Sequence, residues 1–125
     1  TDREKVEYLN DYLRSLLAYE EGASSGITQT FAPHAGELKA ACGSYAGAFS
    51  FLCAAADIPC FTISSEIHVW NLVYVEGRWL HVDVSANDLS GRNGILLNES
   101  YQTGKDQAPE ATAFLEELFI PGSTK

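Results

Sequence analysis

The chain has 125 residues, which suits a single domain, and its 46% apolar and 20% charged residues are typical of a globular protein rather than a disordered one. Its formal net charge of −9 excludes bulk electrostatic attraction to nucleic acid or to an anionic membrane. The apolar runs are far shorter than a membrane span, so we expect no membrane insertion. Because the chain starts at Thr1 and contains no methionine, we expect residues 1–125 to be one domain excised from a longer protein.

The first third of the chain predicts an amphipathic helix followed by a long loop. Residues 3–19 carry apolar side chains three and four positions apart, with charged side chains on the opposite face. Residues 20–37 are rich in glycine, serine and proline and predict a loop with a short extended piece at 27–31. Long loops in compact domains are often functional.

A second helix is predicted from Cys42 to about Ala56. Its apolar stripe consists of Cys42, Tyr45, Ala46, Phe49, Leu52, Cys53 and Ala56. The other faces carry small residues and few charges, so we expect this helix to be buried on most sides. It should end near Pro59, because proline disfavours a helical conformation of the residue before it.

Strands are predicted after this helix. Residues 60–64 form one strand, and residues 67–75 and 78–85 form a hairpin around Glu76-Gly77, since two-residue turns favour glycine. The remaining elements are a turn-rich stretch at 86–94, a short strand at 95–97 and a last helix that starts at Pro109.

The hairpin brings polar side chains together. With Glu76-Gly77 as the turn, the alternation of side chains places four residues on one face: His68, Trp70, Asp83 and Ser85. His68 and Asp83 become diagonal neighbours, which lie about 7–8 Å apart in antiparallel pairs. A hydrogen bond between the imidazole and the carboxylate is therefore feasible from the register alone.

Cys42 opens the second helix, where unpaired N–H groups and the helix dipole favour an anion. A cysteine thiol titrates near pH 8.5, and a helix N-terminus with a neighbouring imidazolium lowers that value to roughly 3.5–7.5. Such local help is needed here, because the acidic chain as a whole disfavours a thiolate. The position of Cys42 therefore suits a nucleophile.

These residues predict covalent acyl transfer. Cys42 attacks a carboxamide, His68 activates the thiol and then protonates the leaving amine, and Asp83 holds the imidazole tautomer. Each residue also has a structural interpretation: Cys42 packs in the core, His68 is an ordinary strand histidine and Asp83 stabilises a turn. The residues by themselves leave both interpretations open.

The other two cysteines, Cys53 and Cys60, either bridge each other or are two small buried apolar residues. The odd number of cysteines, three, forbids complete pairing within the chain. The cysteines and histidines lack zinc-finger spacing, and the acidic residues lack a calcium-loop pattern, so we expect no metal.

Two segments resemble the core of the transglutaminase-like superfamily. These segments are ACGSYAGAFSFLCAAADIPC at residues 41–60 and HVWNLVYVEGRWLHVD at residues 68–83. In this family a cysteine is the first residue of a helix, and the helix ends in a short motif that resembles Ala56-Asp57-Ile58-Pro59 of this chain. A strand with His-x-Trp-Asn follows, and then one with Gly-x-Trp-x-x-x-Asp. Carried over to this chain, the resemblance implies a catalytic triad of Cys42, His68 and Asp83.

The resemblance also implies the fold and the general activity. The fold is a papain-like α+β core, in which a central helix bearing the cysteine packs on an antiparallel sheet. The implied activity is thiol acyl transfer on protein or peptide amides through a thioester, without a cofactor, and the domain is expected to be a monomer. Members cross-link proteins, deamidate or cleave them, or are inactive. Bacterial members with this style of motif are often parts of secreted or envelope proteins, so we expect an extracellular or cell-envelope location.

The remaining predictions concern the substrate cleft. Trp70, Tyr45 and His81 are candidates for lining it, although the size of Trp70 equally suits the core. The chain differs from the family pattern at Ser44, where glycine is usual, and at Ser85-Ala86, where Thr-Trp is frequent. These differences leave a second hypothesis, a catalytically silent binding or structural module of a multidomain surface protein.

Overall fold

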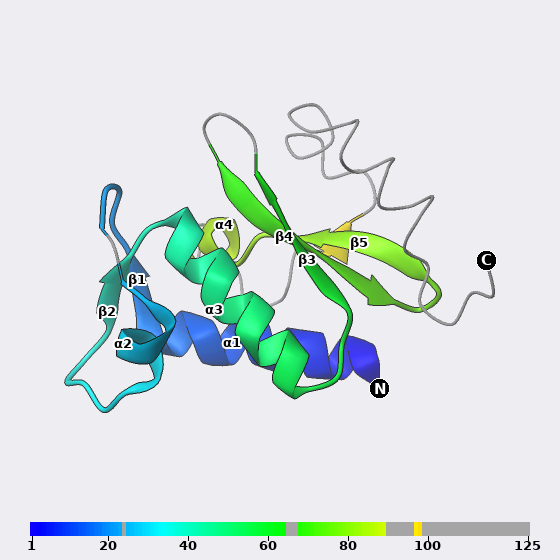
Figure 1. Ribbon diagram of the computed structural model, residues 1–125, viewed down its shortest axis with the longest axis horizontal. Coiled ribbons are helices and arrows are strands. Elements are labelled where there is room, and N and C mark those ends of the chain that lie inside the picture. Colours follow the sequence, from blue (N-terminus) through cyan, green and yellow to red (C-terminus); the bar gives the residue numbers. More distant parts are fainter. Residues whose placement is uncertain (24, 65–67, 90–96, 99–125) are drawn as a thin grey trace.

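A computed structural model describes residues 1–23, 25–64, 68–89 and 97–98. The architecture is α+β, with the helices gathered on one side of a twisted antiparallel sheet (Figure 1). In chain order the elements are α1 (Asp2–Leu16), β1 (Leu17–Tyr19), α2 (Ile27–Phe31), β2 (Leu38–Ala40), α3 (Cys42–Ala55), β3 (Cys60–Ser64), β4 (Val69–Val75), β5 (Arg78–Val82), α4 (Val84–Leu89) and β6 (Leu97–Asn98). No helix of the described segments is both long and apolar enough to cross a membrane.

The first helix is shorter than predicted. It starts at a Thr1 cap, whose hydroxyl accepts a hydrogen bond from the Glu4 N–H at 3.1 Å. The helical pattern continues to Tyr19, but the helix stops at Leu16 and Leu17–Tyr19 forms β1, which pairs in parallel with β2. Pairing with a distant strand satisfies the backbone of this segment, and this tertiary contact outweighs the local helical pattern.

The extended piece predicted at residues 27–31 was wrong, because these residues form the short helix α2. The Gly26 N–H donates to Gln29 Oε1 at 2.9 Å, and the Thr30 hydroxyl donates to the Gly26 carbonyl at 3.0 Å. These local bonds satisfy backbone groups at the helix start. Phe31, the last residue of α2, packs against Phe51 of α3, with ring centroids 5.5 Å apart.

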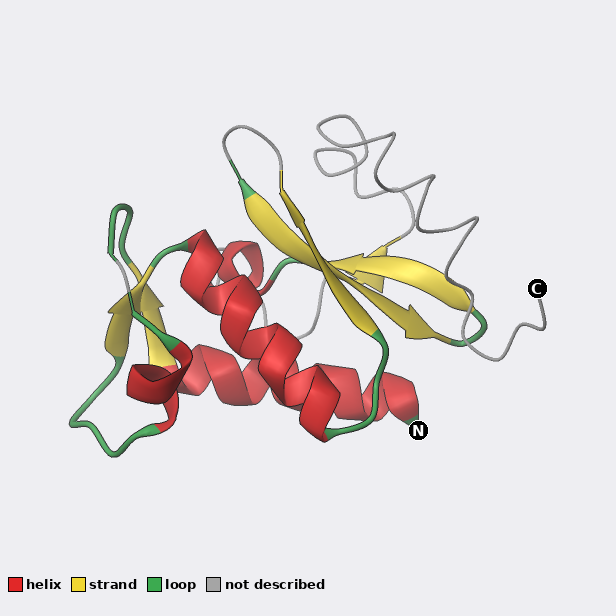
Figure 2. Ribbon diagram, in the orientation of Figure 1, coloured by secondary structure: helices red, strands yellow, loops and turns green. Residues whose placement is uncertain are grey.

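Helix α3 lies at the centre of the fold, between α1 and the sheet (Figure 2). Its start at Cys42 agrees with the sequence prediction, and its end at Ala55 agrees within one residue. After the helix, Asp57 adopts a positive φ of 62°, and the Ile58 N–H returns to the Cys53 carbonyl at 2.9 Å. This hydrogen bond ends the helix and reverses the direction of the chain, so that β3 begins at Cys60.

The sheet has the strand order β3–β4–β5–β6. Glu76 and Gly77 both have positive φ, as a tight hairpin turn requires, and Val75 pairs with Arg78 as predicted. However, β5 ends at Val82 rather than at Ser85, because Asp83 caps α4, which begins at Val84. Of the last predicted elements, the strand at 95–97 is described only at Leu97, in β6, and the helix from Pro109 lies outside the described residues.

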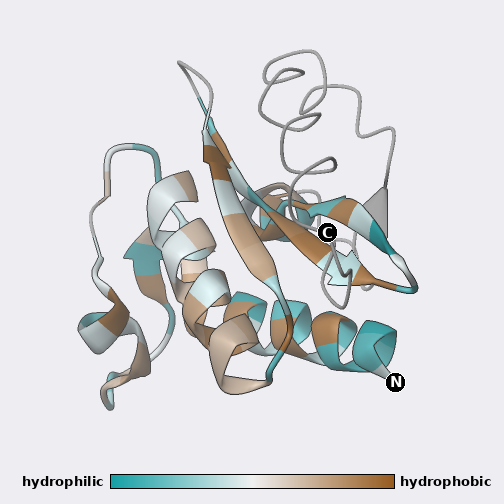
Figure 3. Ribbon diagram, turned by 45° about the vertical axis from the view of Figure 1, so that its right-hand side comes forward, coloured by the Kyte–Doolittle hydropathy of each residue, from teal (hydrophilic) through white to brown (hydrophobic). Residues whose placement is uncertain are grey.

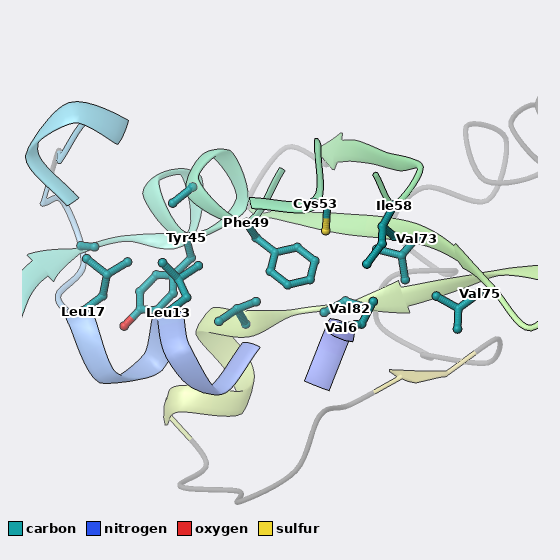
Figure 4. Close-up of a cluster of buried hydrophobic side chains, with 13 residues drawn as sticks. Val6, Leu13, Leu17, Tyr45, Phe49, Cys53, Ile58, Val73, Val75 and Val82 are labelled. Atoms are coloured by element: carbon teal, nitrogen blue, oxygen red, sulfur yellow. The ribbon is translucent and has the colours of Figure 1, made fainter. Parts of the chain in front are cut away.

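The main core lies between α1, α3 and one face of the sheet. Figure 4 shows Phe49 of α3 pointing into the middle of this cluster. Its buried members are Val6, Leu13, Leu17, Ala40, Tyr45, Ala48, Phe49, Cys53, Ile58, Val73, Val75, Val82 and Val84. Along the ribbon of α1, apolar and polar residues alternate, as expected for a helix with one buried side (Figure 3). A smaller cluster consists of Ile63, Trp70, Leu72 and Trp79.

Candidate active site

Cys42 is the first residue of α3 and directly follows the β2 segment and Ala41. Ala41 is extended, and its carbonyl accepts from the Ser44 and Tyr45 N–H groups, which makes Ala41 the helix cap. The Cys42 thiol is free and partly exposed. A sulfur at this position lies at the positive end of the helix dipole and remains open to a reactant.

His68 and Asp83 form a hydrogen-bonded pair, with Nε2 and Oδ2 2.5 Å apart. His68 immediately precedes β4 and Asp83 immediately follows β5, so the hairpin register brings them together as the sequence predicts. The Asp83 side chain is 1% exposed and that of His68 is 24% exposed. Because Nε2 donates to the carboxylate, the neutral ring carries its proton there and Nδ1 is the basic nitrogen.

The pair also perturbs both pKa values. Burial alone would raise the pKa of Asp83, but the hydrogen bond and charge of His68, with the Ala86 N–H and the Ser85 hydroxyl, lower it below its usual value. The hydrogen bond that His68 donates to Asp83 raises the pKa of His68, against the opposing effect of burial. Asp83 therefore stays ionised, and it stabilises a positive charge on His68.

Asp83 has a second role as the cap of α4. Its Oδ1 accepts from the Ser85 hydroxyl at 2.9 Å and from the Ala86 N–H at 3.1 Å, and its carbonyl accepts from the Asn87 N–H. The two carboxylate oxygens thus have separate partners, which fixes the orientation of the oxygen that faces His68. Ser85 keeps the hydroxyl of the threonine that is frequent in the family.

Trp70 and His81 lie beneath His68 rather than at an open surface. The Trp70 and His68 rings stack with centroids 5.7 Å apart and planes 16° apart. The Trp70 Nε1–H donates to His81 Nδ1 at 2.9 Å, and Trp70 and His81 are each 1% exposed. Since an indole nitrogen only donates, the His81 ring that accepts this bond is neutral with its proton on Nε2. This arrangement supports the imidazole of His68 from below.

Tyr45, the third cleft candidate, is also 1% exposed and packs in the main core. Its hydroxyl donates to Asp88 Oδ2, and Asp88 Oδ1 lies 3.7 Å from Arg14 Nε. Burial, followed by the bond to Asp88, raises the pKa of Tyr45. Tyr45 therefore joins α3 to α4 and is kept away from the surface.

Ser44, where the family usually has glycine, connects α3 to the preceding loop. Its hydroxyl accepts from the Ser25 N–H at 3.2 Å, and the Ser25 hydroxyl donates to the Lys39 carbonyl at 2.7 Å. The loop at residues 20–37, for which a functional role was predicted, is thereby hydrogen-bonded to the first turn of α3, which begins at Cys42. This contact explains structurally why a serine rather than a glycine stands at position 44.

Cys53 and Cys60 are both free. Cys53 is fully buried, and a hydrogen bond with the Cys60 thiol, followed by burial, raises the pKa of Cys53. The two thiols lie in contact without a bridge, so Cys53 fits the interpretation as a small buried apolar residue. Among the described residues, no three His, Cys, Asp or Glu side chains gather as a metal site.

Sequence reasoning missed Tyr19, the last residue of β1. Burial, followed by the charges of Cys42, Glu21 and Asp83, raises the pKa of its hydroxyl. Local sequence carries no signal for this position, because it depends on the pairing of β1 with β2. This pairing places Tyr19 opposite Ala40, two positions before Cys42.

Comparison with known families shows which family this chain belongs to. A family model described as "Transglutaminase-like superfamily" matches residues 1–84, which include Cys42, His68 and Asp83. The chain belongs to the transglutaminase-like superfamily. Members of this superfamily are mostly cysteine hydrolases or transferases. The helix α3 packed on the antiparallel sheet is consistent with the superfamily core.

Individual relatives agree with membership of the transglutaminase-like superfamily. The chain is 31% identical over 125 positions to the mouse (Mus musculus) kyphoscoliosis peptidase and 29% identical over 125 positions to the human protein of that name. Each match covers 81% of this chain and 19% of the relative. A peptide-N(4)-(N-acetyl-beta-glucosaminyl)asparagine amidase of Drosophila melanogaster is 50% identical over 52 residues, which are 39% of this chain and 8% of that protein. The chain thus spans less than a fifth of the length of these relatives.

Proposed function

We propose that this domain hydrolyses amide bonds of a peptide or protein, with Cys42 as the nucleophile and His68 as the general base and acid. The observation that carries the proposal is the His68–Asp83 hydrogen bond through Nε2. This bond leaves Nδ1 as the ring nitrogen that takes a proton from a thiol. A histidine that only packed in a strand would not need a buried carboxylate partner that is 1% exposed.

The reaction follows from these roles. His68 Nδ1 takes the thiol proton while the Cys42 sulfur forms a bond to the carbonyl carbon of the amide. The carbon–nitrogen bond then breaks, and the proton on His68 passes to the leaving amine. Water adds to the thioester, His68 takes its proton and returns it to the sulfur, and the carboxylic acid leaves. Asp83 stabilises the positively charged ring in both halves of the cycle.

Water is the proposed acceptor because the two kinds of relative carry the names peptidase and amidase, and both names describe amide hydrolysis. An amine acceptor would make the same thioester a cross-linking intermediate. The chemistry up to the thioester is identical, so the choice lies in what reaches the acyl-enzyme.

The test uses p-nitrophenyl acetate, because an activated ester acylates a reactive thiol without a specific peptide. We expect a burst of p-nitrophenol and a transient acetyl group on Cys42 by mass spectrometry, both absent in Cys42→Ala. In the presence of cadaverine, we expect acetate rather than acetylcadaverine as the main product. Predominant acetylcadaverine would contradict hydrolysis, and a wild-type chain that reacts no faster than Cys42→Ala would favour the silent module.

A further inference from the structure

Trp70 and His81 form a buried pair on one face of the sheet. His81 of β5 pairs with Leu72, and Trp70 lies two positions before Leu72 on the same face of β4, so Trp70 and His81 are diagonal neighbours. Their side chains meet in a hydrogen bond of 2.9 Å, which Trp70 Nε1–H donates to His81 Nδ1. Each residue is 1% exposed. This buried hydrogen bond fixes the indole ring from the side of β5.

The same indole ring stacks on the imidazole of His68. The ring centroids lie 5.7 Å apart and the planes differ by 16°. An aromatic face within about 6 Å of a cation attracts it, and tryptophan does so most strongly of the aromatic side chains. The stack therefore stabilises the charged form of His68, in addition to the Asp83 carboxylate, whose Oδ2 lies 2.5 Å from His68 Nε2.

The hydrogen bond to His81 acts on this stack in two ways. It holds the indole at its present angle, because a rotated indole would leave its N–H buried without an acceptor. It also draws the indole proton toward His81, which leaves more electron density on the ring and strengthens the attraction between that ring and a cation. His81 thus acts on His68 through Trp70.

His81 occupies a position that the family pattern leaves open. In the pattern Gly-x-Trp-x-x-x-Asp, the matching residues of this chain are Gly77, Trp79 and Asp83. A buried strand position that served packing alone would suit an apolar side chain, since burial of an imidazole costs free energy unless the ring is hydrogen-bonded. The bond to Trp70 therefore gives His81 a role beyond filling space.

We propose that His81 is a positioning residue, which fixes and polarises Trp70 so that the indole orients the His68 ring and stabilises its positive charge. In the proposed reaction, that charge forms when His68 takes the proton of the Cys42 thiol. The inference rests on the proposed function for its catalytic meaning. Its physical claim concerns the charge of His68 alone.

The test measures the pKa of His68 by NMR titration of the histidine ring signals. It uses full-length chains that carry Cys42→Ala, so that no thiol titrates together with the ring. The chain has three histidines, and the His68 signal is the one that is lost in His68→Ala. In His81→Leu the pKa of His68 should fall by roughly 0.7, because a weaker stack destabilises the charged ring. The His34 signal should titrate as in the parent chain.

His81→Asn is the matched control. Its Oδ1 branches from Cγ as Nδ1 does in histidine, so asparagine offers an acceptor to the Trp70 N–H without an imidazole. It should restore most of the pKa of His68 that His81→Leu loses. A fall in His81→Asn as large as in His81→Leu would show that the hydrogen bond has no effect on His68, and would overturn the inference.

A second readout is the alkylation of Cys42 by iodoacetamide in chains that keep the thiol. At about pH 6 a thiolate depends on a charged His68, whereas at about pH 10 the thiol ionises without help. His81→Leu should lower the rate at about pH 6 by up to about fivefold and leave the rate at about pH 10 within about twofold of wild type. An equal fall at both pH values would mean a general distortion of the site and would contradict the inference.

The remaining outcomes are also decisive. An unchanged pKa of His68 in His81→Leu overturns the inference. Should thermal unfolding show that His81→Leu does not fold, Trp70→Phe carries the same test, because it keeps an aromatic ring and removes the donor of the same hydrogen bond. Failure of the proposed function is distinguishable, since wild-type Cys42 would then be alkylated no faster than an ordinary thiol. The NMR titration does not use the thiol, so it decides the role of His81 in that case too.

Discussion

We expect Asp83→Asn to lower the rate at which Cys42 is acylated by about 10⁴-fold while leaving the domain folded. The amide oxygen of asparagine still caps α4 by accepting from the Ala86 N–H, whose present distance to Asp83 is 3.1 Å. Its NH₂ group, however, faces His68 Nε2 as a donor. The ring then takes the tautomer with its proton on Nδ1, which cannot accept a proton from the thiol. Burst kinetics with p-nitrophenyl acetate measure the loss.

Asp83→Ala separates the two roles of this carboxylate. It removes the cap of α4 as well as the partner of His68, so it should also lower the free energy of unfolding by about 1–2 kcal/mol, as measured by urea denaturation. Asp83→Asn should lose only a few tenths of a kcal/mol, because asparagine caps as well as aspartate. An asparagine variant with wild-type acylation would show that the pair has only a structural role.

Phe49→Ala should lower the free energy of unfolding by about 3–5 kcal/mol. Phe49 is fully buried and its ring occupies the middle of the main core, so its removal leaves a cavity between α3 and the sheet (Figure 4). Domains of this kind are stable by only about 5–15 kcal/mol, so the loss is a large fraction of the total. Urea denaturation followed by far-UV circular dichroism measures the change.

Phe51→Ala is the matched control on the same helix. Phe51 is 51% exposed and packs against the ring of Phe31, so the same substitution should cost only about 1 kcal/mol. Equal losses for the two variants would contradict the assignment of the main core to the Phe49 face of α3.

The hairpin shows which part of the site is readable from sequence. Its two-residue turn at Glu76-Gly77 fixes the register, and the register alone brings His68 to Asp83. The start of α3 could also be predicted from neighbouring residues, because its apolar stripe begins at Cys42. Both predictions depend on residues close together in the chain.

The features that sequence reasoning missed depend on distant partners. Leu17–Tyr19 follows a helical pattern, but pairing with β2 makes it a strand and places Tyr19 opposite Ala40, two positions before Cys42. In the same way, Asp88 lies in a segment predicted as turn-rich, and α4 brings it to Tyr45 and moves that tyrosine from the predicted cleft into the core. Parallel pairing of three-residue strands leaves no periodic signal in the sequence.

The central claim is that His68, charged and held by Asp83, activates Cys42. The pH dependence of iodoacetamide alkylation, with the label mapped by mass spectrometry, tests it most directly. Because the pKa of His68 is raised, its ring keeps a positive charge at about pH 6, where an ordinary thiol is almost entirely protonated. We predict rapid labelling of Cys42 at that pH in wild type and its loss in His68→Ala. Labelling of Cys42 no faster than an ordinary thiol, and unchanged in His68→Ala, would contradict the account.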